Sequence, residues 1–207
     1  MDAFATLAGR VTAEHEERGS RFLAIAEPVL DRAGAESFFE RETRAQRNPT
    51  HVVPAFRLRD GTEFSSDAGE PAGSAGAPLL AALGGAGLHD VAAVVVRWYG
   101  GTNLGVGGLA RAYGGALARA LDGAPTARGE RAAKVLVRYG HEQTAAVMRC
   151  VHGNGGRDLD HAYGEHGVEL RFLVPLARCD ALGACLRDAT RGAVTPERLG
   201  ESVIRSR

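Results

Sequence analysis

The sequence has no excess of charge of either sign and almost no lysine. Its 25 basic residues balance 25 acidic residues, and Lys134 is the only lysine, so nearly every cation is an arginine. A protein that is held along nucleic acid by bulk charge is strongly basic. The balance therefore excludes broad coating of nucleic acid, while a local contact to RNA or to a small anion stays open.

Long hydrophobic runs are also absent. No stretch of the chain approaches the ~20 consecutive apolar residues that are needed to span a bilayer. The first ten residues lack an apolar core flanked by basic residues, which a secretory signal peptide requires. We therefore expect a cytoplasmic protein without membrane contact.

Cysteine is scarce, with three residues at Cys150, Cys179 and Cys185. The number is odd, and no pair has the two-residue spacing of a redox or zinc motif. We therefore expect no disulfide framework and interpret the cysteines as small core residues. We also expect no metal and no cofactor, because the spacings of Cys150 to the nearest histidines match no zinc pattern. Those histidines are His152, His161 and His166.

What is present favours a folded chain of the α+β class. Apolar residues make up 44% of the 207 residues, a length that allows one large domain or two small ones. Residues 124–129 (APTARG) have the composition of a linker. We therefore predict two domains, residues 1–128 and 129–207.

The first half alternates between strand and helix patterns. Residues 10–27 read as a hairpin, and Asp31 is a good N-cap for the helix that follows. Residues 52–58 read as a strand that turns at Asp60-Gly61. Residues 91–99 are apolar on both faces, as in a central buried strand. A helix then presents one residue in four to the core: Leu109, Tyr113, Leu117 and Leu121.

The second half has a simpler order, β-α-β-β-α-β within ~75 residues, which is the ferredoxin-like pattern. The predicted strands and helices cover residues 132–139, 141–151, 159–163, 168–174, 182–189 and 193–204.

Two segments of the first half carry residues suited to chemistry. Residues 65–76 (SSDAGEPAGSAG) place hydroxyls, carboxylates and glycines between a hairpin and a helix. Asp67 and Glu70 could bind a cation, orient a water or pair with arginines. The alternative is a surface loop whose serines, Ser66 among them, and aspartate cap the next helix.

The second segment, residues 97–113, runs from a strand through a glycine loop into a helix. Glycines let the free N–H groups of a helix start approach an anion, with Arg97 or Arg111 as partner. The segment is neither a P-loop nor a dinucleotide fingerprint. A tight strand-to-helix joint is the alternative interpretation.

His51 is the only histidine close in sequence to both segments. It could act as an acid/base or contact a ligand, and the alternative is a structural or merely exposed residue. We find no Ser-His-Asp arrangement and no aromatic stacking platform. We predict that both segments lie in one cleft, with a weak anion site at the start of the 107–121 helix. The candidate ligand-binding residues are His51, Ser66, Asp67, Glu70, Arg97, Gly100, Gly101, Gly105, Gly107, Gly108 and Arg111.

Together the two segments resemble the signature of the YigZ/IMPACT family. The resemblance rests on SSDAGEPAGSAGAP at 65–78, followed by VVVRWYGGTNLGVGGLARAY at 94–113. It extends over about residues 22–121, and the second half fits the bacterial C-terminal domain of that family in length and pattern.

The resemblance implies an N-terminal α/β sandwich like domain IV of elongation factor G and related ribosomal-protein domains. It implies a C-terminal ferredoxin-like domain similar to domain V of that factor. Eukaryotic members regulate translation initiation by competing for an activator of the general-control kinase, whereas bacterial members have no settled biochemical role. A proline-dipeptidase label given to some members is not extended to this chain.

The sequence departs from the family pattern at five positions. The departures weaken a catalytic interpretation and strong phosphate binding, because two basic positions and one acidic position are lost. They are Val52 for a polar residue, Ala68 for an acid, Ser74 for a threonine, Ala77 for a basic residue and Asn103 for a lysine.

Two functions follow as hypotheses. The first is a non-enzymatic binding module that acts in translation, with the ribosome, RNA or a translation-associated protein as partner. The alternative is a hydrolase or phosphoryl-handling enzyme that uses His51, Asp67 and Glu70 beside the glycine loop.

Overall fold

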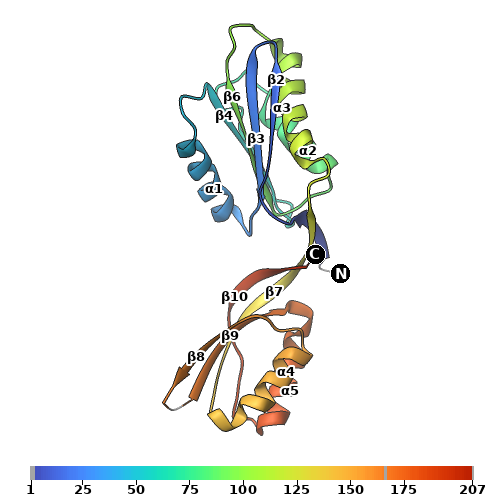
Figure 1. The fold of residues 1–207 in the computed structure, drawn as a ribbon. Coiled ribbons are helices and arrows are strands. Elements are labelled where there is room, and N and C mark those ends of the chain that lie inside the picture. The colour runs from blue at the N-terminus through green and yellow to red at the C-terminus, as the bar shows by residue number, and fades with distance from the viewer. Residues whose placement is uncertain (1–2, 166, 207) are drawn as a thin grey trace. The chain divides into compact units, whose positions relative to one another are not determined.

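The computed structural model describes residues 3–165 and 167–206, and the chain divides into two compact units (Figure 1). Of the described residues, the first unit contains Phe4–Arg128 and the second contains Ala3 and Gly129–Ser206. Each unit combines a β-sheet with helices, which confirms the predicted α+β class. His166, one of the histidines considered for a metal site, lies outside the described residues.

The first unit is built on an antiparallel five-stranded sheet with its most apolar strand in the centre. The strand order is β2 (Val11–Glu17), β3 (Ser20–Pro28), β6 (Val91–Trp98), β4 (His51–Arg57) and β5 (Glu63–Ser65). Residues from Val91 to Arg97 of β6 are all buried. The continuous apolar run therefore reflects burial on both faces, as predicted for a central strand.

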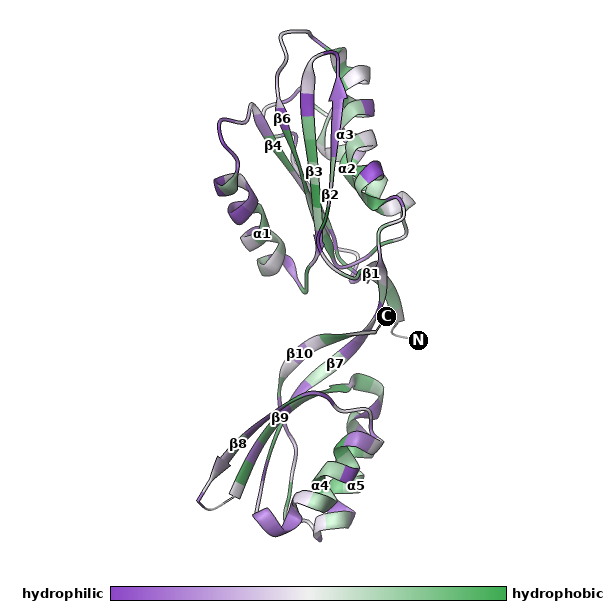
Figure 2. Ribbon diagram, viewed as in Figure 1, coloured by the Kyte–Doolittle hydropathy of each residue, from purple (hydrophilic) through white to green (hydrophobic). Residues whose placement is uncertain are grey.

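Helices cover both faces of this sheet (Figure 1). Helix α1 (Arg32–Ala45) packs on one face with Ala92 and Val94, while α2 (Gly76–Gly85) and α3 (Gly105–Leu121) pack on the other. In Figure 2 the inner strands β3 and β6 are coloured as hydrophobic. The N-cap prediction is confirmed, because Asp31 Oδ1 accepts a hydrogen bond from Gly34 N at 2.8 Å.

The second unit shows the predicted β-α-β-β-α-β order. Its elements are β7 (Thr126–Tyr139), α4 (Thr144–Gly153), β8 (Arg157–Gly164), β9 (Gly167–Pro175), α5 (Cys179–Thr190) and β10 (Glu197–Ser206). Strand β9 lies between β8 and β7, and both β10 and β1 (Ala3–Leu7) pair with β7. Short 3-10 turns, η1 (His141–Gln143) and η2 (Leu176–Arg178), precede the two helices.

The segment interpreted as a linker is more regular than its composition indicates. Residues 126–129 form the start of β7, and Pro125 O accepts a hydrogen bond from Ala8 N at 2.8 Å. Ladder and backbone hydrogen bonds therefore offset the weak strand propensity of this glycine- and proline-containing stretch. Within the described residues, every helix is too short or too polar to cross a membrane.

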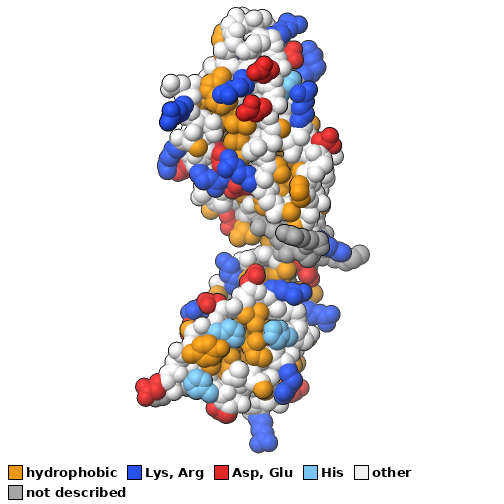
Figure 3. All heavy atoms as spheres, in the orientation of Figure 1, with side chains coloured by type: hydrophobic (Ala, Val, Ile, Leu, Met, Phe, Trp, Pro, Cys, Tyr) orange, Lys and Arg blue, Asp and Glu red, His pale blue; other side chains and the backbone are white. Residues whose placement is uncertain are grey.

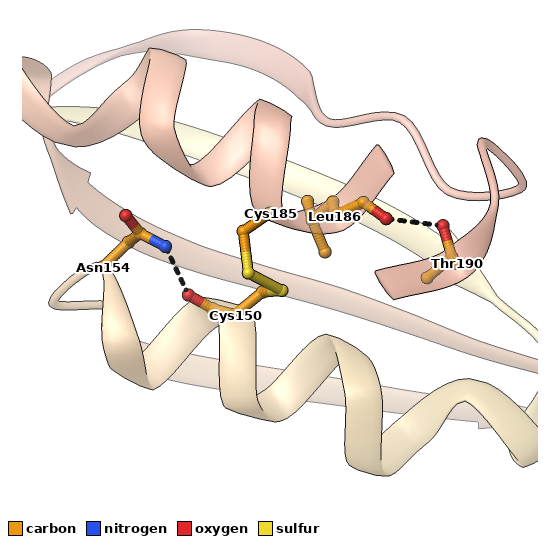
Figure 4. Close-up of a disulfide and its surroundings, with 5 residues drawn as sticks. All are labelled: Cys150, Asn154, Cys185, Leu186 and Thr190. Atoms are coloured by element: carbon orange, nitrogen blue, oxygen red, sulfur yellow. Dashed lines mark hydrogen bonds between the residues drawn. A yellow bond between two sulfur atoms is a disulfide. The ribbon is translucent and has the colours of Figure 1, made fainter. Parts of the chain in front are cut away.

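The expectation that the chain has no disulfide is wrong. Cys150 of α4 and Cys185 of α5 are joined, with their Cα atoms 5.7 Å apart (Figure 4). They lie 35 residues apart in the sequence, so no short sequence motif indicates that they form a disulfide. They meet because both helices pack side by side on one face of the sheet. Cys179 is the free cysteine.

Replacing Cys150 and Cys185 together by alanine should lower the free energy of unfolding of the second unit by about 2–4 kcal/mol, because the unfolded chain regains the freedom that the link removes. Urea unfolding, followed through amide signals of α4 and α5, measures the loss. Cys179→Ala is the control and should unfold close to wild type. Equal midpoints for the double variant and wild type would contradict the role of the link.

Candidate functional site

The carboxylate of Glu70 is the point at which the predicted site residues meet. Its Oε1 accepts hydrogen bonds from Arg97 Nη1 and from the Tyr113 hydroxyl, each at 2.7 Å. The side chains of Arg97 and Glu70 are 6% and 4% exposed. Because an unpaired buried charge is costly, each of these groups depends on the other. Burial and the neighbouring Glu70 raise the pKa of Tyr113 far above its usual range, which keeps the phenol a donor.

Arg97 connects this carboxylate to the strand beside it. Its Nη2 donates to Ser20 Oγ at 3.3 Å, and Ser20 Oγ also accepts from Gly100 N at 3.2 Å. The guanidinium carbon lies 5.6 Å from the ring centroid of Phe22 and 5.3 Å from that of Tyr99. Arg97 Nε has no hydrogen-bond partner among the described residues. The start of β3, the end of β6 and Glu70 are thus held as one cluster.

His51 lies at the edge of the same cluster. Strand pairing places it opposite Arg97, and its Nδ1 is 2.8 Å from the carbonyl oxygen of Ala68. A carbonyl oxygen only accepts, so Nδ1 carries the proton. The other ring nitrogen, Nε2, lies 3.9 Å from Glu70 Oε1. Gly69 has a φ of +90°, and a Cβ there would sit 3.4 Å from the imidazole, so a glycine suits both the backbone and the contact.

Asp67 has a structural role. Its carboxylate accepts backbone hydrogen bonds from Gly73, Ala75 and Gly76 at 2.8–2.9 Å, which caps the start of α2. The bond from Gly73, followed by that from Gly76, lowers the pKa of Asp67. Ser66 Oγ accepts from Ala68 N at 3.1 Å. For these two residues the structure agrees with the alternative of a self-capped loop.

The glycine loop leads into a helix start that is open to solvent. Helix α3 begins at Gly105, two residues before the predicted start at 107, with no side-chain cap and no acidic residue in its first turn. Gly105, Val106 and Gly107 are exposed, as is Arg111 one turn later. The helix therefore presents free N–H groups and the positive end of its dipole outward.

The glycines of this loop have different roles. Gly100 packs against the β2–β3 turn, since a Cβ there would lie 1.9 Å from Gly19 O. Gly101 has a φ of +87°, which favours glycine. Gly108 lies in the first turn of α3, where a Cβ would lie 3.1 Å from Leu104 Cβ. Close packing thus explains Gly100 and Gly108, while the positive φ of Gly101 shapes the exposed loop.

Aromatic residues at the same end were missed by the sequence analysis. The Arg21 guanidinium carbon lies 4.0 Å from the ring centroid of Trp98, whose Nε1 donates to Arg47 O at 3.1 Å. Tyr99 is 46% exposed, and its hydroxyl donates to Asn103 Oδ1 at 3.2 Å. The signal was Trp98 and Tyr99, which directly follow Arg97 and were interpreted only as the end of a strand. Arg21 of β3 is paired with Trp98 of β6, and this pairing places the Arg21 guanidinium over the Trp98 ring.

We call this end of the first unit the glycine-loop end; it comprises residues 99–108 with Arg21, His51, Glu70, Trp98 and Arg111. Two surface hollows, of about 630 and 720 Å³, lie elsewhere, the first between the ends of α2 and α3 and the second in the second unit. Within residues 3–165 and 167–206, no three His, Cys, Asp or Glu side chains group closely enough to hold a metal ion.

Comparison with known proteins defines the family. Residues 18–121 match the profile of the Impact N-terminal domain, a range that begins at the β2–β3 turn and contains every candidate site residue. The chain is 32% identical over 198 residues to "IMPACT family member YigZ" of Escherichia coli (strain K12). The matched region covers 94% of this chain and 97% of that protein. The chain belongs to the IMPACT family.

Other relatives support this membership. The "IMPACT family member in pol 5'region" of Thermus thermophilus is 38% identical over 186 residues, 86% of this chain and 97% of that protein. A solved structure described as "Crystal structure of an hypothetical protein" is 31% identical and superposes with a TM-score of 0.71, covering 95% of this chain and 97% of that one. The predicted IMPACT family is thus confirmed.

The capping role of Asp67 in this IMPACT-family domain predicts a pH dependence. Because its folded pKa is lowered, Asp67 stabilises the fold above its unfolded pKa of about 4, and that contribution is lost as the pH falls through the folded pKa. Asp67→Asn should therefore flatten the acid side of the stability profile, measured by urea unfolding. The exposed Asp188→Asn is the control, and an Asp67→Asn profile that matches it and wild type would contradict the cap.

Proposed function

We propose that the chain is a non-enzymatic binding protein that contacts RNA of the translation machinery through the glycine-loop end. The observation that carries the proposal is the uncapped, acid-free start of α3. Free N–H groups at a helix start favour phosphate groups, and Arg111 lies exposed one turn later. The family resemblance, with its implied role in translation, points in the same direction.

An exposed aromatic ring in the glycine loop suits a single-stranded or looped RNA. Tyr99 offers this ring, whereas Arg21 stacks on Trp98 on the α1 face of the same sheet end. Sequence-selective RNA contacts stack unpaired bases on such rings or on guanidinium planes. Figure 3 shows charged side chains of both signs mixed over the visible surface, without a broad single-sign area. A local contact of this kind fits a chain without net charge.

The carboxylates of Asp67 and Glu70 already accept hydrogen bonds within the protein, which argues against the hydrolase alternative. Asp67 is held by three backbone N–H groups, and Glu70 by Arg97 and Tyr113. Hydrolysis of a peptide or phosphoester needs a nucleophile with a positioned base or a metal. Among the described residues, no hydroxyl or thiol hydrogen-bonds to His51, whose near contacts are the Ala68 carbonyl and Glu70. These contacts favour binding over turnover.

Co-sedimentation with purified ribosomes at low and high salt tests the proposal. Wild type should pellet at low salt and be released as salt rises. Arg111→Gln combined with Arg21→Gln should weaken pelleting and lower the slope of log affinity against log salt by about 0.7–0.9 for each phosphate group that the variant no longer binds. Arg149→Gln, an exposed arginine on α4, is the matched control and should pellet like wild type.

Three outcomes would contradict the proposal. Wild type could stay in the supernatant at low salt, or the double arginine variant could pellet like wild type. The third outcome concerns catalysis: if wild type hydrolyses dipeptides or phosphoesters and His51→Gln does not, the enzyme alternative is correct.

A further inference from the structure

Strand β8 leaves one edge of the sheet in the second unit open. The strand order is β1, β7, β9 and β8, so β8 stands at one end of the sheet (Figure 1). Among the described residues, β8 pairs with β9 alone. The outer N–H and C=O groups of an edge strand form a template on which another strand can pair. This edge can therefore accept a partner strand, and its side chains decide which partner fits.

The aromatic ring of Tyr163 lies exposed along this edge. It is 71% exposed, and the His161 ring stacks on one side of it with centroids 5.8 Å apart. The half-buried Leu159 packs against the core of the unit. A hollow of about 720 Å³ adjoins the ring, with Tyr163, Gly164 and Glu165 in its lining. A strand added at this edge would therefore find room for its side chains and would cover apolar surface that now meets water.

The two ends of β8 carry opposite charges. Arg157 begins the strand, and Glu165 directly follows its last residue. Both side chains are exposed, and neither forms an ion pair with another residue that the structure describes. The two residues lie at equal distances in the sequence on either side of His161. An edge with a cation at one end and an anion at the other is complementary to a second copy of itself that runs in the opposite direction.

We propose that two copies of the chain pair antiparallel along β8, about a two-fold axis at His161. In that register Arg157 of each copy lies opposite Glu165 of the second copy, so the interface contains two ion pairs. Tyr163 of each copy lies opposite Leu159 of the second copy, which forms an aromatic–aliphatic cross-strand pair. The two-fold axis repeats every contact, as an interface between identical surfaces requires.

The other acids of the strand are compatible with this register. Like charges destabilise a strand pair when they stand directly opposite each other. Asp160 would face Ala162 of the second copy, and its neighbour on β9 is Arg171. Asp158 would face Gly164 of the second copy. Neither acid therefore meets an acid across the interface.

The shape of β8 limits the pairing to two copies. The register of β8 with β9 shifts between Arg157 and Asp160, and Asp158 has a φ of +50°. An irregularity of this kind disrupts the ladder locally, so the regular stretch of the edge is short. Each copy has one β8 edge, and pairing two copies uses both. We therefore expect a closed, weak dimer, because so short a ladder buries less area than a stable interface needs. The interface lies in the other unit from the glycine-loop end and goes beyond the function proposed there.

Reversal of the two end charges tests the register on the full chain. Arg157→Glu and Glu165→Arg each turn both ion pairs into repulsive contacts. Sedimentation velocity over a concentration series should show wild-type self-association that each variant weakens about tenfold or more, since two exposed pairs are lost and replaced by repulsion. An equimolar mixture of the two variants should associate about as strongly as wild type, because a heterodimer restores opposite charges at both positions.

Matched variants separate the β8 edge from the rest of the unit. Arg149→Glu on α4 and Asp188→Arg on α5 reverse exposed charges on the helices and should associate like wild type. Tyr163→Ala removes the exposed ring from both cross-strand pairs and should weaken association about two- to tenfold.

The inference is overturned if wild type sediments as a monomer at every concentration, or if it forms open assemblies larger than a dimer. It is also overturned if both charge variants associate like wild type, which would place the interface elsewhere, or if their mixture associates no better than either variant alone. A monomeric wild type whose Ala162 and Gly164 amide signals shift only when an extended peptide is added would assign the edge to another partner and would overturn the inference as well.

Discussion

The organisation of the first unit depends on one buried carboxylate. Glu70 comes from a loop, Arg97 from the central strand and Tyr113 from the third helix, and hydrogen bonds of 2.7 Å join them. None of these polar groups can be buried alone without a large free-energy penalty. The loop, the strand end and the helix are therefore fixed together, and His51 and Ser20 join them at the edge.

This arrangement separates the acidic residues of the motif from its exposed surface. Glu70 and Asp67 point into protein contacts, whereas the glycine loop and the first turn of α3 face solvent without an acid. An anion that approaches the helix start therefore meets N–H groups and Arg111. The same arrangement leaves an acid-free surface for the RNA contact that we propose, and it makes the two carboxylates scaffold residues.

Much of the fold was predictable because its signals are local. Strand β6 is apolar on both of its faces, and Asp31 caps a helix. Both features depend on residues that are neighbours in the sequence, and both predictions are confirmed. The Cys150–Cys185 link and the contact of Glu70 with Tyr113 depend on packing between distant segments, so no spacing shows them. Tyr113 was predicted as a core residue, but its periodicity says nothing of where the hydroxyl points. Strand β1 is short and pairs with β7, more than a hundred residues later in the sequence, so no local pattern indicates it.

The central claim is that the Glu70–Arg97 pair holds the glycine-loop end together, and the free energy of unfolding of a variant set tests it most directly. Glu70→Leu leaves Arg97 buried without an anion and should lose about 3–5 kcal/mol, while Glu70→Leu with Arg97→Met removes both charges and should recover much of that loss. Glu63→Leu, at an exposed surface pair with Arg57, should change stability by no more than about 1 kcal/mol. A Glu70→Leu chain as stable as the Glu63→Leu chain would contradict the claim.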